Sequence, residues 1–406
     1  MVRVLFVAPF ALDTTMRFVR AAASLPDVEL GIVTQEPFEK LGADLKSRIS
    51  GFERVDNAEN LQHLRHAVRK LAHSMHGIDR VVGILEQLQV PLAELRQELG
   101  IEGLSVDAAH NFRDKARMKD RFGAAKIPCA KHRRCHSASE AMQFAEQVGF
   151  PVVAKPIAGA GARNTARLET VEQLGNWLRS FPPTPQAPLM LEEFVTGREF
   201  SFDSASIRGR HLLHSITEYF PTPLEVMENP WIQWCVLLRR ELDRPEYAPI
   251  FEAGPRALDT LGMHTGLTHM EWFARPDGSI AISEVAARPP GAQFTSLLSY
   301  AYDFDFYRGW AELVSCDRFD VPKRRYAVGA AFLRGQGRGK VKKIHGIEEA
   351  RRDLGELVVE AKLPKPGQPG ASSYEGEGYV ILRGEDSSAI EQALARVVRT
   401  IRVELA

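Results

Sequence analysis

Apolar and polar residues follow two different repeats along the first part of the chain. Residues 2–8 form a short run rich in β-branched side chains, which is typical of a buried parallel strand. The series continues with strands predicted at 29–34 and 80–85 and helices at 13–24 and 61–75. Strands and helices that alternate through short links predict a doubly wound α/β unit at the start of the chain.

The rest of the chain mixes both repeats. Helices are predicted at 112–125, 137–148, 171–181, 246–261 and 304–314, and strands at 150–155, 189–194, 199–207, 268–274 and 279–285. The sequence Pro276-Asp277-Gly278 is a turn signal that joins the last two strands into a hairpin. The polar segment 317–325 predicts a linker, and the remaining residues alternate short strands with Gly and Pro turns before a helix near 388–403.

Composition narrows the classes of function. Lys and Arg together number 52, as do Asp and Glu, so no general basic face for nucleic acid or anionic membrane is expected. No apolar stretch of about 18 residues predicts a membrane span. The opening apolar run is too short for a signal peptide, because Asp13 and Arg17 soon follow it. Four scattered cysteines in a long chain favour a reducing, cytoplasmic location over a disulfide framework.

The first candidate for chemistry is Lys155, at the end of the predicted strand 150–155. A lysine at a strand end can hold a phosphate as a compact cation. The small-residue loop that follows contains Gly159 and Gly161, which would let backbone N–H groups approach a polyphosphate. Surface Lys-Pro turns are common, so this element indicates nucleotide binding only together with others.

The second candidate lies within residues 191–199, where a short acidic and apolar strand makes a sharp Thr-Gly turn. Glu192 and the peptide groups from Glu193 to Val195 could hydrogen-bond the edge of an adenine, and Glu199 could accept hydrogen bonds from ribose hydroxyls. Glu192 and Glu193 are alternatives for the adenine role, and the other would face solvent. The competing interpretation of the segment is a solvated hairpin.

The third candidate is the predicted hairpin over 268–285. Glu271 and Glu284 occur on its two strands and can face each other. Carboxylate oxygens suit Mg²⁺, which usually also binds substrate phosphates. Arg288, four residues after Glu284, offers a rigid fork to a phosphate or to a developing oxyanion.

In this order and spacing, the three elements resemble the ATP-grasp superfamily. The resemblance implies an α+β fold with an N-terminal α/β lobe (1–110), a nucleotide-binding lobe of two subdomains (111–316, with the small subdomain at about 126–195) and a small C-terminal α+β lobe (325–406). It implies ATP and Mg²⁺ as cofactors, with Mn²⁺ as a substitute for Mg²⁺. Related enzymes are often dimers, so a homodimer is compatible with the resemblance, although no stretch of the sequence indicates an interface.

The resemblance also implies a role for each candidate residue. Lys115 and Lys155 would bind ATP phosphates, and Arg288 would lie near the γ-phosphate and an acyl phosphate. The remaining roles are adenine binding (Glu192, Glu193, Val195), ribose binding (Glu199), metal binding (Glu271, Glu284) and a lid over the phosphates (loop 158–163, with Gly159 and Gly161).

The spacing of Glu284, Arg288 and Gly291, Glu-x-x-x-Arg-x-x-Gly, resembles the L-amino-acid ligase and carnosine-synthase branch, which makes dipeptides or similar amides. Ala286 departs from the Glu-x-Asn pattern that is common at the second metal site, so the number of Mg²⁺ ions, one or two, stays open. The resemblance implies that a carboxylate attacks ATP to give an acyl phosphate, which an amine then attacks. The alternatives are a carboxylase-type enzyme that activates bicarbonate and a catalytically silent nucleotide-binding regulator.

Other motifs carry weaker predictions. Glu86 ends a predicted parallel strand, where ligands commonly bind, and could touch the amino-acid substrate. A cluster of Cys and His at 129–136 suggests zinc only superficially, because a second ligand cluster is missing and basic residues interrupt the first. The basic Gly-rich segment 335–343 is interpreted as a solvated hairpin. Four aromatic residues either shape an acceptor pocket or pack locally: Tyr219, Phe220, Trp231 and Trp234.

Overall fold

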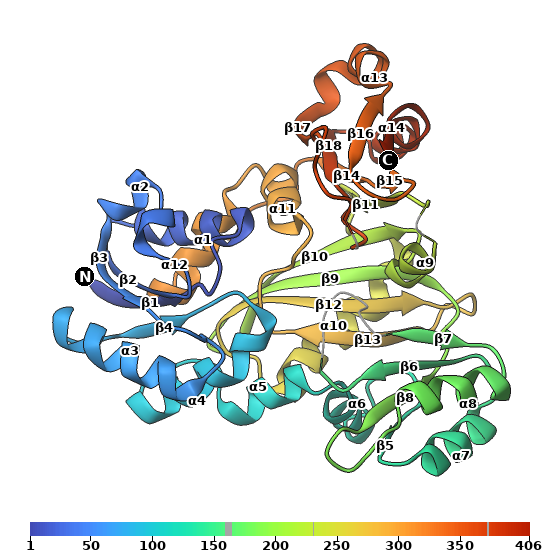
Figure 1. Cartoon of the computed structure of the whole chain (residues 1–406), viewed down its shortest axis with the longest axis horizontal. Coiled ribbons are helices and arrows are strands. Elements are labelled where there is room, and N and C mark those ends of the chain that lie inside the picture. The colour runs from blue at the N-terminus through green and yellow to red at the C-terminus, as the bar shows by residue number, and fades with distance from the viewer. Residues whose placement is uncertain (159–164, 230, 372) are drawn as a thin grey trace.

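A four-stranded parallel sheet, with strand order β3-β2-β1-β4, forms the N-terminal lobe (Figure 1). The structure is a computed structural model that describes residues 1–158, 165–229, 231–371 and 373–406. The strands of this lobe are β1 (Val2–Val7), β2 (Val28–Thr34), β3 (Ile49–Arg54) and β4 (Arg80–Val82), and its helices are α1 (Asp13–Ala23), α2 (Ala43–Lys46), α3 (Leu61–Ser74) and α4 (Gln89–Leu99). Apolar side chains of α3 and α4 pack against one face of the sheet, and those of α1 against the other.

A second small sheet, with strand order β5-β8-β6-β7, is antiparallel throughout. It contains β5 (His132–Cys135), β6 (Val152–Pro156), β7 (Ala166–Leu168) and β8 (Leu189–Glu193). Helices α7 (Ala138–Val148) and α8 (Val171–Ser180) share one apolar core with this sheet. Helices α5 (Val106–Arg113) and α6 (Lys115–Ala124) link it to the N-terminal lobe.

An eight-stranded sheet occupies the centre of the molecule, with strand order β13-β12-β9-β10-β11-β14-β18-β17 (Figure 1). Its strands are β9 (Arg198–Ile207), β10 (Arg210–Phe220), β11 (Trp234–Leu238), β12 (Gly266–Ala274), β13 (Ile280–Ala286), β14 (Ala327–Leu333), β17 (Val358–Lys362) and β18 (Gly378–Gly384). Helix α10 (Ala248–Leu261) packs on the face that carries Phe200, Phe202 and Trp272. The opposite face of β9, β12 and β13 carries the polar residues of the candidate site.

The central sheet contains strands from both sides of the segment that the sequence predicts as a linker. Residues 317–325 have no helix or strand, yet β14, β17 and β18 follow them and extend the same sheet. The C-terminal part adds α13 (Ile347–Leu354), α14 (Ser387–Thr400) and a small sheet of β15 (Gly335–Gln336), β16 (Val341–His345) and β19 (Arg402–Leu405). The basic segment 335–343 therefore pairs with β19, and Lys342 lies 2.7 Å from Glu404 at the surface.

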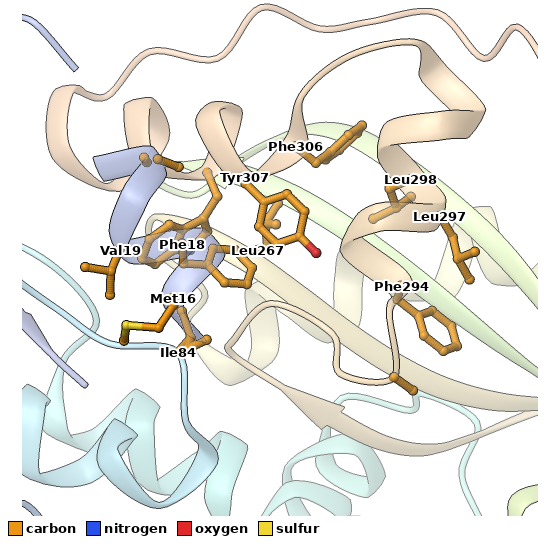
Figure 2. Close-up of a cluster of buried hydrophobic side chains, with 14 of the residues drawn as sticks. Met16, Phe18, Val19, Ile84, Leu267, Phe294, Leu297, Leu298, Phe306 and Tyr307 are labelled. Carbon is orange, nitrogen blue, oxygen red and sulfur yellow. The ribbon is translucent and has the colours of Figure 1, made fainter. Parts of the chain in front are cut away.

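An aromatic core fixes the N-terminal lobe against the helices that follow the central hairpin. These helices are α11 (Phe294–Tyr302) and α12 (Phe306–Cys316). Figure 2 shows Phe18 of α1 beside Tyr307 of α12, and their ring centroids are 4.8 Å apart. The Trp310 ring lies 5.0 Å from the Phe18 ring in the same core. Because α12 packs on α1, the chain after the central hairpin also stabilises the first lobe.

The prediction of one continuous helix over 112–125 is wrong. Asp114 has an extended backbone, so α5 ends at Arg113 and a new helix, α6, begins at Lys115. The Asp114 carboxylate accepts a hydrogen bond from Arg117 N–H and caps α6. Lys115 is therefore the first residue of a helix.

Other differences have local causes. The strand predicted over 80–85 ends at Val82, and at the next residue, Gly83, a Cβ would come 2.8 Å from Leu92 and 3.2 Å from the carbonyl oxygen of Val7. Glu86 thus begins a short 3-10 helix (Glu86–Leu88) instead of ending a strand. The helix predicted to reach residue 403 stops at Thr400, because residues 402–405 form β19, which pairs with β15 and β16. The elements that were not predicted are strands β3, β5, β7, β10 and β11 and helices α2, α4, α9 (Pro223–Glu228), α11 and α13. Among the helices of the described residues, none is both long and apolar enough to cross a bilayer.

Candidate functional site

A cleft of about 510 Å³ is lined by residues of the small sheet, the loop after β8 and the polar face of the central sheet. Nine residues predicted from the sequence line it: Lys115, Lys155, Glu192, Glu193, Val195, Glu199, Glu271, Glu284 and Arg288. Gly159 and Gly161, predicted in the phosphate loop, lie outside the described residues. The structure therefore brings most of the predicted residues to one place, although they come from segments up to 173 positions apart in the sequence.

Glu271 of β12 and Glu284 of β13 are directly opposite each other across the two antiparallel strands. Asp277 accepts hydrogen bonds from Ser279 in the tight turn at residues 275–279, and a β-bulge at Ser283 then shifts the register so that Glu284 lies opposite Glu271. Residues opposite each other in an antiparallel pair project to the same side of the sheet. Both carboxylates are partly exposed to the cleft, so two oxygen donors face one space.

Lys115 reaches this pair from the first turn of α6. Its Nζ atom lies 2.6 Å from Oε1 of Glu284. The break between α5 and α6 makes Lys115 the first residue of a helix. If α5 continued without a break, residue 115 would lie in the middle of one long helix. In the part of the chain that the structure describes, no cluster of three or more His, Cys, Asp or Glu side chains is arranged to hold a metal ion.

A second lysine, Lys155 of β6, forms a buried ion pair with Glu192 of β8. Lys119 of α6, which is fully buried, lies 3.3 Å from the other oxygen of Glu192. Burial opposes the charged form of Lys155, but the Glu192, Glu284 and Glu271 carboxylates outweigh it and raise the pKa of Lys155. Burial likewise opposes the charged form of Glu192, but Lys119 and Lys155 lower its pKa. The three groups thus form a charged cluster in one wall of the cleft.

This cluster changes the interpretation of Glu192. The sequence offers its carboxylate to an adenine, whereas the structure bonds that carboxylate to two lysines. Lys119 was not among the residues predicted for the site. It lies one helical turn after Lys115, at the i+4 position, and that spacing is the signal that could have identified it.

The segment after β8 is held to the backbone around it. Glu193 N–H donates to the carbonyl of Lys131, and Phe194 N–H donates to the carbonyl of Pro151. The Glu193 carboxylate accepts a hydrogen bond of 3.1 Å from Lys131 N–H. At the next turn, a Cβ on Gly197 would come 2.5 Å from the carbonyl oxygen of Ala274, so only glycine allows this approach to β12. Val195 is thereby positioned in the cleft lining.

Glu199, at the start of β9, is buried beside Glu271. Burial and the Glu271 charge raise the pKa of Glu199 well above its usual value. A carboxyl group that keeps its proton can donate a hydrogen bond as well as accept one. This matches a partner with hydroxyl groups better than a cation.

Arg288 follows β13 and extends toward the N-terminal lobe. Its Nε atom donates to Oε2 of Glu86 at 2.6 Å, and its Nη1 donates to the carbonyl of Pro289 at 3.0 Å. Arg113 lies 3.7 Å from the other oxygen of Glu86. Glu86, predicted as a substrate contact, thus holds Arg288 across the boundary between two lobes. The separation of 202 positions explains why no local pattern indicates this pair.

One end of the cleft is aromatic. The rings of Tyr219 and Trp234 are 5.6 Å apart, and Tyr374 lies 4.6 Å from Trp234. All three residues line the cleft, together with Phe294. The other two aromatic residues noted in the sequence do not line it: Phe220 packs in the C-terminal core, and Trp231 is 62% exposed.

Comparisons with known proteins agree with this arrangement. Residues 120–299 match the model of the ATP-grasp domain, and residues 331–406 match the model of L-amino acid ligase C-terminal domain 2. The alanine–anticapsin ligase of Bacillus subtilis (strain 168) is 27% identical over 53% of this chain and 50% of its own length. The chain therefore spans about half the length of that relative.

Two further matches cover more of the chain. The L-arginine-specific L-amino acid ligase of Bacillus subtilis is 22% identical over 80% of both chains. The crystal structure of an L-amino acid ligase from Bacillus licheniformis has a TM-score of 0.80, covers 100% of this chain and 99% of its own, and is 17% identical. At that identity the structural match shows a shared fold.

Proposed function

We propose that this chain, which carries an ATP-grasp domain followed by an L-amino acid ligase C-terminal domain, is an ATP-dependent ligase that joins an amino acid to an amine through an acyl phosphate. One observation carries the proposal: two glutamates face each other across β12 and β13 while two lysines point into the same cleft. Opposed carboxylates and ammonium groups are the groups that a metal-bound triphosphate requires.

Different residues bind the different parts of the nucleotide. The backbone around Val195 takes the adenine edge, and Glu199 takes the ribose hydroxyls. Lys115 and Lys155 bind phosphate oxygens, so Lys115 exchanges its bond to Glu284 for one to phosphate when ATP enters. The buried Glu192 keeps Lys155 and Lys119 extended toward the phosphates.

Glu271 and Glu284 would hold Mg²⁺. Two carboxylates fit this ion, because Mg²⁺ commonly takes one or two carboxylates and completes its shell with phosphate oxygens and water. Ala286, opposite His269 on the neighbouring strand, has no oxygen in its side chain, which supports one protein-held cation over two. When bound, the cation neutralises charge on the transferred phosphate and its leaving group.

The reaction balances in two steps. An oxygen of the substrate carboxylate attacks the γ-phosphorus of ATP, the bond to the bridging oxygen breaks, and ADP leaves. The amine nitrogen then attacks the acyl carbon, the bond to the phosphate oxygen breaks, and phosphate leaves while the nitrogen loses a proton to water. Arg288 places its guanidinium where the carboxylate and the developing oxyanion gather negative charge.

An ADP-release assay tests this function. The purified chain, with Mg²⁺ and ATP, is screened against amino acids, small carboxylates and bicarbonate, each with and without an amine. Release of ADP only when an organic acid and an amine are both present supports the ligase. Release that requires bicarbonate would favour a carboxylase, and nucleotide binding without release under any mixture would favour a silent regulator.

Replacing Glu86 by glutamine is expected to lower kcat/KM for the carboxylate substrate by about 10- to 100-fold, because a displaced Arg288 no longer meets the reacting carboxyl group. The KM for ATP is expected to change less than about 2-fold, since Glu86 lies away from the nucleotide residues. Steady-state kinetics with each substrate varied in turn measure both effects.

The matched control for Glu86 is Glu98→Gln in the same lobe. Glu98 pairs with Arg65 at the surface between α3 and α4. Surface pairs contribute little to stability, so this variant should behave like the wild type. Equal kinetics for the Glu86 and Glu98 variants would refute the role given to Glu86.

A further inference from the structure

A line of polar side chains crosses the central sheet beside the two opposed glutamates. His269 of β12 is the direct neighbour of Asp203 on β9, and its Nδ1 lies 2.6 Å from Oδ1 of Asp203. The other oxygen of Asp203 accepts a hydrogen bond of 2.8 Å from the hydroxyl of Ser201. Both oxygens of the Asp203 carboxylate are therefore bonded, and the carboxylate fixes the orientation of the ring.

The second ring nitrogen of His269 faces the candidate metal residues. Its Nε2 atom lies 3.7 Å from Oε1 of Glu271 and 3.4 Å from the hydroxyl of Tyr219. The ring of Phe294 covers the imidazole, with 5.4 Å between the centroids. Asp203, His269 and Glu271 thus form a chain of contacts that ends at the cleft.

The placement of this chain points to a role beyond folding. Asp203 is 2% exposed and Ser201 is fully buried, and a buried carboxylate costs free energy unless it is paired. On the opposite face of β9 and β12, the alternating positions carry Phe200, Phe202 and Trp272, which pack without charge. The charged residues lie on the face that looks into the cleft.

We infer that His269 is a positioning residue, fixed by Asp203, that holds one oxygen of Glu271 and leaves the other oxygen directed at the cation. The inference rests on the proposed function, since it assumes that Glu271 binds a divalent metal. Groups that hydrogen-bond to metal ligands orient them, and losing such a group typically lowers metal affinity by about 10- to 100-fold. Across the sheet, Ala286 offers no polar atom that could replace His269 in this position.

One feature of the sequence predicts that His269 lies beside Glu271. Side chains two positions apart on a strand project from the same face, so His269 and Glu271 are expected on the same face of their strand. Asp203 is one of three polar residues at alternating positions of β9, with Glu199 and Ser201. The pairing of these two strands, which brings Asp203 to His269, required the structure.

The test measures metal binding without turnover. Mn²⁺ is titrated into the protein in the presence of ADP, and free Mn²⁺ is read from its electron paramagnetic resonance signal. His269→Ala is expected to weaken Mn²⁺ binding by about 10- to 100-fold, and Asp203→Asn by about 10-fold because the ring loses its charged anchor. His269→Gln, whose amide can donate a hydrogen bond to Glu271 in place of the 3.7 Å ion-pair contact, should recover most of the affinity.

The matched control is His214→Ala. His214 of β10 is paired with Ser204 of β9 on the other face of the central sheet, and this variant should bind Mn²⁺ like the wild type. Thermal melting checks that each variant is folded, and if His269→Ala is not, Asp203→Asn decides. Wild-type Mn²⁺ affinity in folded His269→Ala or Asp203→Asn would overturn the inference while leaving the proposed function intact. A wild-type protein that binds no Mn²⁺ with ADP would overturn both.

Discussion

Replacing Glu284 by glutamine is expected to abolish turnover, with kcat lower by about 1000-fold or more, while the fold is unchanged. The substitution keeps the size of the side chain and removes the charge that would hold the cation opposite Glu271. The side chain is partly exposed to the cleft, and the change also replaces the carboxylate that pairs with Lys115 by a neutral amide. ADP release under saturating substrates measures kcat, and circular dichroism with thermal melting checks the fold.

Nucleotide binding separates this effect from a general loss of the site. In EDTA, ADP should bind the Glu284→Gln variant about as well as the wild type, because the lysines and the segment around Val195 are unchanged. With Mg²⁺ added, only the wild type should bind ADP more tightly. Glu391→Gln is the control, since Glu391 pairs with Arg239 at the surface, away from the cleft. Near-normal turnover in Glu284→Gln would refute its assignment as a metal ligand.

The two strands that carry the opposed glutamates could be predicted, because the turn at 276–278 and the apolar runs beside it are local signals. The sequence placed the strands at 268–274 and 279–285, and the structure has Gly266–Ala274 and Ile280–Ala286. The exact pairing could not be derived from the turn, because the register that pairs Trp272 with Ile282 would place Ser283 opposite Glu271. A β-bulge at Ser283 shifts the register and brings Glu284 opposite Glu271.

Features that depend on distant segments could not be predicted in the same way. Lys119 and Lys155 meet at Glu192 only because α6, β6 and β8 converge, and nothing near Glu192 in the sequence indicates that its carboxylate is buried. The pair of Glu86 and Arg288 depends on how the first lobe sits against the end of β13. The linker at 317–325 does not separate two sheets, because β14 pairs with β11 across it. Polar composition predicts an exposed segment but not how the strands after it pair.

Edge and interrupted strands were missed for a related reason. In β3, a Cβ at Gly51 would come 2.6 Å from a methyl group of Leu71, so glycine fits beside α3 without a shift of that side chain, and it weakens the strand signal. Seven of the nine residues of helix α11 are buried, because it packs on the sheet and on α12, and it therefore lacks an exposed polar face that would reveal a helical repeat. In both cases tertiary packing determined which residues occur, and no element was predicted from their local pattern.

Replacing Lys155 by methionine is expected to have two separable effects. Loss of the ammonium group should weaken ATP binding and lower kcat/KM by about 100-fold, because Lys155 is proposed to bind phosphate. The same change leaves the buried Glu192 with Lys119 alone, which should lower the free energy of unfolding by about 3 kcal/mol. Denaturant unfolding measures the second effect, and kinetics with ATP varied measure the first.

The double variant Lys155→Met with Glu192→Gln distinguishes catalysis from stability. Removing the charge of Glu192 removes the burial cost that the single variant exposes, so the double variant should regain most of the lost unfolding free energy. Its activity should remain low, because the phosphate still lacks its cation. If activity returned together with stability, Lys155 would serve only to neutralise Glu192, and the phosphate role would fall to Lys115 and Lys119. Because one side chain is proposed to satisfy a buried acid and bind the substrate, only a measurement of both quantities on both variants can assign its role.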